Sequence, residues 1–139
     1  MSETLARREL RITRVFDAPR ERVWRMWTDA DRLATWWGKR GWNTPPGGAI
    51  VDARPGGTFR VRSVAEDDGR EMVTEAVFRE VLAPERLVFA DAGGGVATVM
   101  LTDLGDGRTQ MRFHTTVHAS RTAEAGMRSA FDRLAEQLA

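Results

Sequence analysis

One arginine lies on an otherwise apolar stretch near the start of the chain. Between residues 9 and 16 the side chains alternate, and Arg14 falls on the same face as the apolar ones. If that face is turned inward, the guanidinium needs an anion or several acceptors, because an unpaired buried charge is unfavourable. Two roles fit this position. One is a structural ion pair, with Glu75 or Glu80 as candidates, and the other is a contact to a carboxylate, phosphate or enolate of a ligand.

The tryptophans form the second group, since all five lie between positions 24 and 42. Trp36 and Trp37 are adjacent, so on a helix they point about 100° apart. One could pack inside while its neighbour lines the mouth of a cavity, with the loop from Gly38 to Gly48 as a lid. Core packing is the alternative role for each aromatic side chain of the candidate set. The candidate ligand-binding residues are Arg14, Trp36, Trp37, Trp42, Phe59, Phe78, Phe113, Met127 and Phe131.

The residue types that support nucleophilic or metal chemistry are sparse. The absence of cysteine excludes thiolate nucleophiles, disulfides and cysteine metal sites. His114 and His118 are four residues apart, which on a predicted strand is about 13 Å and too far for one ion. No serine occupies a nucleophile-elbow setting, and the glycines at 93–95 lack the helix and lysine of a phosphate cradle. We therefore predict no metal, no cofactor and no catalytic residue, and favour a non-enzymatic role.

Composition sets the class of protein. A chain of 139 residues with 42% hydrophobic and 29% charged residues suits one globular domain over 1–139, with residues 1–7 as a loose lead-in. The net charge is +1 and the arginines are interleaved with acids, so nucleic acid is not an expected partner. No apolar run reaches membrane-spanning length and no secretory signal is recognised, which predicts a cytoplasmic protein.

The last segment organises the expected fold. Residues Ser120 to Leu138 carry an apolar stripe at helical spacing, and Ser120 is suited to the N-cap. Two short helices are predicted earlier, over Pro19–Trp27 and Asp29–Trp37, the second begun by a capping box of Thr28 and Asp31. The predicted strands are Glu9–Phe16, Ala49–Ala53, Thr58–Ala65, Glu71–Leu82, Arg86–Ala90, Val96–Leu104 and Arg108–His118. Together these elements predict an α+β fold in which a curved antiparallel sheet of about six to seven strands wraps the C-terminal helix.

Several short motifs occur in a characteristic order: Ile12-Thr13-Arg14-Val15-Phe16-Asp17-Ala18-Pro19, Val23-Trp24, Trp36-Trp37-Gly38, Arg54-Pro55-Gly56-Gly57 and Ala83-Pro84-Glu85-Arg86-Leu87-Val88-Phe89. Over about residues 8 to 138 the chain resembles the Hsp90 ATPase activator homologues of the START/Bet v 1-like (SRPBCC, polyketide cyclase/dehydrase-like) superfamily. The resemblance implies a helix-grip fold with a cavity between sheet and C-terminal helix. Where many members have Gly-Trp early in that helix, this chain has Gly126-Met127, so one cavity wall is less aromatic.

Three functions are compatible with these patterns. The favoured one is non-catalytic binding of a small hydrophobic or amphipathic molecule in the sheet–helix gap, by a monomer or homodimer. The second is a polyketide cyclase-like enzyme that positions its substrate, with Arg14 and His114 as the ionisable residues. The third is a co-chaperone or regulator that acts on a protein partner. The resemblance suggests an Hsp90-type chaperone, but the chain leaves no room for the separate N-terminal domain that the eukaryotic co-chaperones use.

Overall fold

The computed structural model of the protein describes residues 7–118 and 121–139. The helices are α1 (Arg20–Thr28), α2 (Ala30–Leu33) and α3 (Arg121–Leu138). The strands are β1 (Arg7–Phe16), β2 (Trp42–Asn43), β3 (Ala49–Val51), β4 (Thr58–Ala65), β5 (Glu71–Leu82), β6 (Arg86–Ala90), β7 (Val96–Gly105) and β8 (Arg108–His118). No helix among these residues has the length and apolar content that crossing a bilayer requires.

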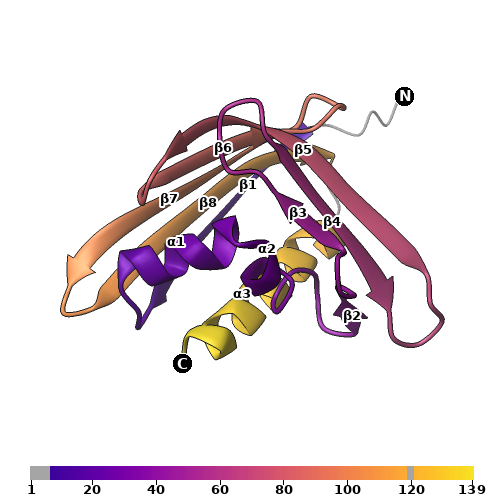
Figure 1. Ribbon diagram of the computed structural model, residues 1–139, viewed down its shortest axis with the longest axis horizontal. Coiled ribbons are helices and arrows are strands. Elements are labelled where there is room, and N and C mark those ends of the chain that lie inside the picture. Colours follow the sequence, from indigo (N-terminus) through magenta and orange to yellow (C-terminus); the bar gives the residue numbers. More distant parts are fainter. Residues whose placement is uncertain (1–6, 119–120) are drawn as a thin grey trace.

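Within the described residues, the eight strands form one antiparallel sheet in the order β1-β8-β7-β6-β5-β4-β2, with β3 also paired to β4. Figure 1 shows the sheet curving over α3, with α1 and α2 on the same concave side. Neighbours from β4 to β8 are joined by short turns, which favour antiparallel pairing of consecutive strands. The predicted α+β helix-grip fold, a curved sheet wrapped on one long C-terminal helix, is confirmed.

Alternation along the strands places the core on the concave face. In β4, every second residue from Phe59 to Ala65 is buried, and the intervening side chains are half-buried. The stripe of α3 lies against this face, and Ala130, Phe131 and Leu134 are buried. The centre of the core is aromatic: Trp27 stacks on Phe113 with ring centroids 6.2 Å apart. This packing ties the first helix, the sheet and the last helix together.

The second short helix differs from its prediction. It runs only from Ala30 to Leu33, and residues 34–36 form turns in place of a further helical turn. Its N-cap is Asp29, whose carboxylate accepts from the backbone N–H groups of Asp31 and Arg32. Thr28 belongs to α1 instead and donates to the carbonyl oxygen of Trp24. A carboxylate is at least as good an N-cap acceptor as a threonine hydroxyl, so the cap falls one residue later than predicted.

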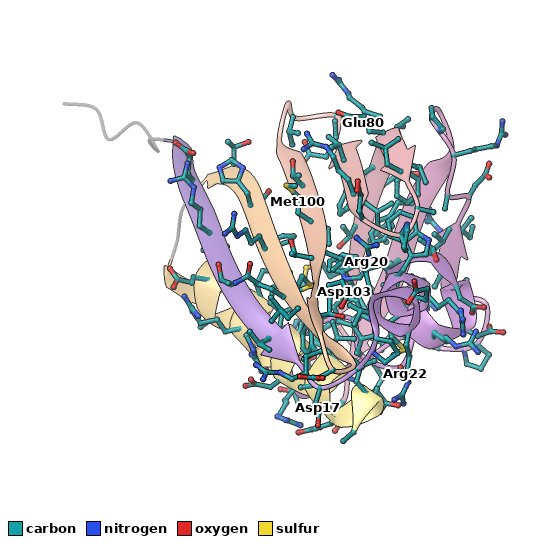
Figure 2. The ribbon with its side chains drawn as sticks, turned by 90° about the vertical axis from the view of Figure 1, so that its left-hand side faces the viewer. Asp17, Arg20, Arg22, Glu80, Met100 and Asp103 are labelled. Carbon is teal, nitrogen blue, oxygen red and sulfur yellow. The ribbon has the colours of Figure 1, made fainter. Side chains whose placement is uncertain are left out.

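Other boundaries also differ from the sequence prediction or lie outside the described residues. Strand β1 begins at Arg7, inside the segment 1–7 that was expected to be a lead-in, and β3 ends at Val51 and not at Ala53. The segment from Gly38 to Gly48, which was expected to be a loop, contains β2, in which Trp42 pairs with Ala65 of β4. The predicted N-cap at Ser120 lies outside the described residues. The other end of α3 is anchored by α1, because the guanidinium of Arg22 donates to the carbonyl oxygen of Leu138 at 2.9 Å. Figure 2 shows Arg22 beside this end of α3.

Candidate ligand cavity

A cavity of about 440 Å³ lies between the concave face of the sheet and the N-terminal half of α3. Its walls come from β1, β4, β5, β6, β7, β8, the turn between β6 and β7, α3, and residues 37–42, which follow α2 and end in the first residue of β2. The lining residues are Leu10, Trp37, Gly38, Lys39, Trp42, Ser63, Met72, Thr74, Glu75, Ala76, Phe89, Asp91, Gly95, Ala97, Phe113, Thr115, Gly126, Met127 and Ala130. This volume falls within the range of small-molecule sites, and the lining is mostly apolar.

Four of the predicted ligand-binding residues line this cavity: Trp37, Trp42, Phe113 and Met127. Trp37 is half-buried, while its neighbour Trp36 is fully buried and donates its indole N–H to the carbonyl oxygen of Met26 at 2.9 Å. Trp37 is therefore part of the cavity wall, whereas Trp36 belongs to the core. This hydrogen bond joins the buried indole of Trp36 to α1.

Three other predicted residues, Phe59, Phe78 and Phe131, are in the core behind the lining. They contact the rings that face the cavity. Phe59 stacks on Phe89 at 4.9 Å between centroids, and Phe131 meets Phe113 edge to face at 5.2 Å. These buried rings hold the aromatic wall in place and do not themselves reach the cavity.

Arg14 is placed away from the cavity and has a structural partner. Its guanidinium donates to the carboxylate of Asp132 on α3 at 2.8 Å and lies 5.9 Å from the ring centroid of Phe16. The two acids that the sequence suggested as partners are paired elsewhere: Glu75 lies 3.7 Å from Arg60, and Glu80 lies 3.2 Å from Arg86. Arg14 thus joins the first strand to the last helix.

The histidine of the cyclase hypothesis lies on the other face of the sheet. Register pairs His114 of β8 with Arg11 of β1, and its ring contacts the carboxylate of Glu9 at 2.8 Å. Hydrogen bonding to His114, assisted by the charge of Arg11, lowers the pKa of Glu9. His114 and Arg14 therefore do not converge on one site. Within residues 7–118 and 121–139 no three potential ligands gather to hold a metal ion.

Hydrogen bonds from Arg133 hold segment 37–42, which forms one side of the cavity, against α3. The guanidinium of Arg133 donates to the carbonyl oxygens of Gly38 and Trp42, both at 2.9 Å, and to that of Trp37 at 3.2 Å. Burial, and then repulsion from Arg40, lower the pKa of Arg133. Arg40 of the same segment makes two further contacts to α3. Its backbone N–H donates to the hydroxyl of Ser129, and its guanidinium pairs with the carboxylate of Glu136.

The cavity exists because small residues stand at inward positions. Ala76, Ala97 and Ala130 are buried and contribute little volume to the wall. A Cβ atom built on Gly126 of α3 would meet nothing within 4 Å, so the helix leaves open space there. The sequence prediction concentrated on large aromatics and missed these positions. They could have been predicted from small residues at those positions of a strand or helix whose side chains face the core.

The fold and cavity together define a helix-grip protein of the START/Bet v 1-like superfamily. A family model described as "Activator of Hsp90 ATPase homolog 1-like protein" matches residues 17–139, and the chain belongs to that family. The resemblance seen in the sequence motifs is thereby confirmed. Among functionally curated proteins, no match to the chain was found.

Solved structures support the same assignment. Protein CV1439 from Chromobacterium violaceum superposes with a TM-score of 0.83 at 25% identity, over 94% of this chain and 97% of that one. A protein from Arthrobacter aurescens gives a TM-score of 0.81 at 26% identity, over 99% and 89%. The AHSA1-like protein from Aeromonas hydrophila gives 0.78 at 26% identity, over 91% and 90%. The helix-grip architecture is therefore shared over nearly the whole chain.

Proposed function

We propose that the protein binds a small, mostly apolar or amphipathic molecule in the cavity between its sheet and α3, without transforming it. The observation that carries the proposal is the cavity of about 440 Å³, whose walls include the rings of Trp37, Phe89 and Phe113. Burying about 300 Å² of apolar ligand surface there would contribute roughly 7 kcal/mol before the costs of association. The family and fold support a ligand-binding role in general.

A titration with N-phenyl-1-naphthylamine, a neutral fluorescent probe, tests this proposal. We expect saturable binding with one site, accompanied by quenching of tryptophan fluorescence because Trp37 and Trp42 line the cavity. Gly126→Leu should weaken binding by at least about tenfold, since its side chain would occupy the open space beside α3.

Ala125→Leu is the matched control for that variant. Ala125 is the neighbouring residue on the same helix, is exposed, and is not among the lining residues. It should leave the affinity within about twofold of the unmodified protein. If the probe shows no saturable binding, or if Gly126→Leu and Ala125→Leu bind it equally well, the cavity is not a ligand site.

A second candidate function, interaction with a protein partner, is favoured by the outer face of the sheet. Val73 and Val77 on β5 are 45% and 49% exposed there, and Met100 on β7 is 39% exposed. Exposed apolar side chains that form a contiguous patch are typical of interaction sites. The family description suggests an Hsp90-type chaperone as the protein to try. Stimulation of that chaperone's ATPase, lost in a Val73→Ser, Val77→Ser variant, would favour this function, whereas no stimulation would count against it.

A further inference from the structure

Three charged residues line the cavity, and two of them already have partners. The carboxylate of Asp91 accepts from the backbone N–H groups of Gly93 and Gly95, both at 2.9 Å, and so holds the β6–β7 turn. Glu75 pairs with Arg60 across β4 and β5. The third residue, Lys39, is exposed at the rim and forms no ion pair with any residue in the described ranges.

A buried hydroxyl lies at the same end of the cavity. Ser63 is only 4% exposed and lines the cavity. Its Oγ would be 3.8 Å from a Cβ atom built on Gly38, the residue before Lys39. A hydroxyl that lines the cavity can donate a hydrogen bond to a ligand atom bound there.

The backbone that carries Lys39 is fixed, and its surroundings are basic. Arg133 binds the carbonyl oxygens on both sides of Lys39, and those acceptors are neutral, so they do not cancel its charge. The acids nearest this segment are engaged: Glu136 pairs with Arg40, and Glu66 accepts from the side-chain amide of Asn43 at 2.8 Å. This edge of the cavity therefore offers a cation without an ion-pair partner, carried on a fixed backbone, and a hydroxyl donor beside an apolar interior.

We infer that the ligand is an amphipathic organic acid whose anionic group is bound by Lys39 and Ser63 while its apolar part lies against Phe89, Phe113 and Met127. This inference rests on the proposed function, because it names the chemical class of the ligand for the same cavity. An ammonium and a hydroxyl both donate to a carboxylate, and charge-assisted hydrogen bonds are about twice as strong as neutral ones. An ester or alcohol of the same size would lack the ionic contact.

Calorimetric titrations with decanoate and with methyl decanoate separate these possibilities. Lys39→Met should weaken decanoate binding by about tenfold and change methyl decanoate binding by less than about twofold. Lys39→Arg keeps the charge and should retain decanoate affinity within about twofold. Ser63→Ala should weaken decanoate binding by about threefold. Arg128→Met removes an exposed cation from α3 outside the lining residues and controls for the general field of the protein.

The inference is overturned if Lys39→Met leaves decanoate affinity unchanged, or weakens the acid and the ester alike. In either case the cavity still binds apolar molecules, and the proposed function stands without an acidic ligand. If neither decanoate nor its ester binds and the neutral naphthylamine probe also fails, the proposed function falls together with the inference. Selective loss of decanoate in Lys39→Met, with retention in Lys39→Arg, supports both.

Discussion

The guanidinium of Arg133 on α3 donates a hydrogen bond of 2.9 Å to the carbonyl oxygen of Gly38, which is 95 positions earlier in the chain. Gly38 has a φ of +88°, a conformation that glycine adopts without strain, so its carbonyl can turn toward the helix. The last helix thereby fixes segment 37–42, which forms one edge of the cavity. The shape of the candidate site thus depends on a contact between distant parts of the chain.

Replacing Arg133 should weaken both the fold and the site. Arg133→Met leaves the carbonyl oxygens of Trp37, Gly38 and Trp42 without their shared donor, and we expect a loss of about 2 kcal/mol in the free energy of unfolding. Arg133→Lys keeps the positive charge and N–H donors and should recover part of it, since all of these carbonyl contacts come from the single nitrogen Nη1. Urea denaturation and probe titration measure the two effects.

Arg128→Met on the same helix is the control, since Arg128 makes only an exposed pair with Glu124. Its effect on unfolding should be below about 0.5 kcal/mol. Equal stability of Arg133→Met and Arg128→Met would show that the carbonyl contacts do not hold segment 37–42.

Gly126→Ala should stabilise the protein. Gly126 lies inside α3, its φ is not positive, and a methyl group there meets open space. Alanine is favoured over glycine in a helix interior by about 1 kcal/mol, so the midpoint of thermal unfolding should rise by a few degrees. Calorimetry measures the change. A fall in the unfolding temperature would mean that space beside Gly126 is already filled.

The ion pair between Arg14 and Asp132 should contribute little to the free energy of unfolding. Both side chains retain contact with water, at 26% and 55% exposed, and such pairs contribute about 0.2–1 kcal/mol. A double-mutant cycle with Arg14→Met and Asp132→Asn should give a coupling energy of about 0.5 kcal/mol that shrinks in high salt. A coupling energy of several kcal/mol, or loss of ligand affinity in Arg14→Met, would contradict the purely structural role.

Stability should depend on pH through Glu136. Its hydrogen bond from Arg40 lowers its pKa below the ordinary value of 4.5. As the pH falls, the carboxylate takes up its proton at a higher pH in the unfolded chain than in the folded protein. The stabilisation is therefore fully present above the ordinary value of 4.5. It is lost as the pH falls through the lowered folded-state pKa.

The difference in unfolding free energy between the unmodified protein and Glu136→Gln should therefore be largest near neutral pH and shrink toward about pH 3. Denaturation at several pH values measures this difference. Glu85→Gln, which removes an exposed carboxylate without an ion pair in the described part of the chain, is the control. A constant difference for Glu136→Gln would rule out the proposed linkage.

Much of the architecture follows from local sequence. Alternating apolar residues and glycine-containing turns predicted most strands correctly, because side chains on a strand alternate strictly between its two faces. The apolar stripe of α3 predicted the closing helix, and the ordered motifs predicted the family. The short helix ending at Leu33 was overestimated, because a tryptophan-rich stretch can satisfy helical spacing while its side chains are drawn into different layers.

The site required tertiary structure. Sequence indicated that Trp37, Phe113 and Met127 are large and apolar, but burial alone does not distinguish a core residue such as Phe131 from a cavity wall. Arg14 and Arg133 are both half-buried arginines. The fold pairs one with Asp132 and turns the other toward backbone carbonyls. The types of the residues determined which side chains are buried. The strand register and the position of α3 determined which of these side chains contact one another and where the cavity lies.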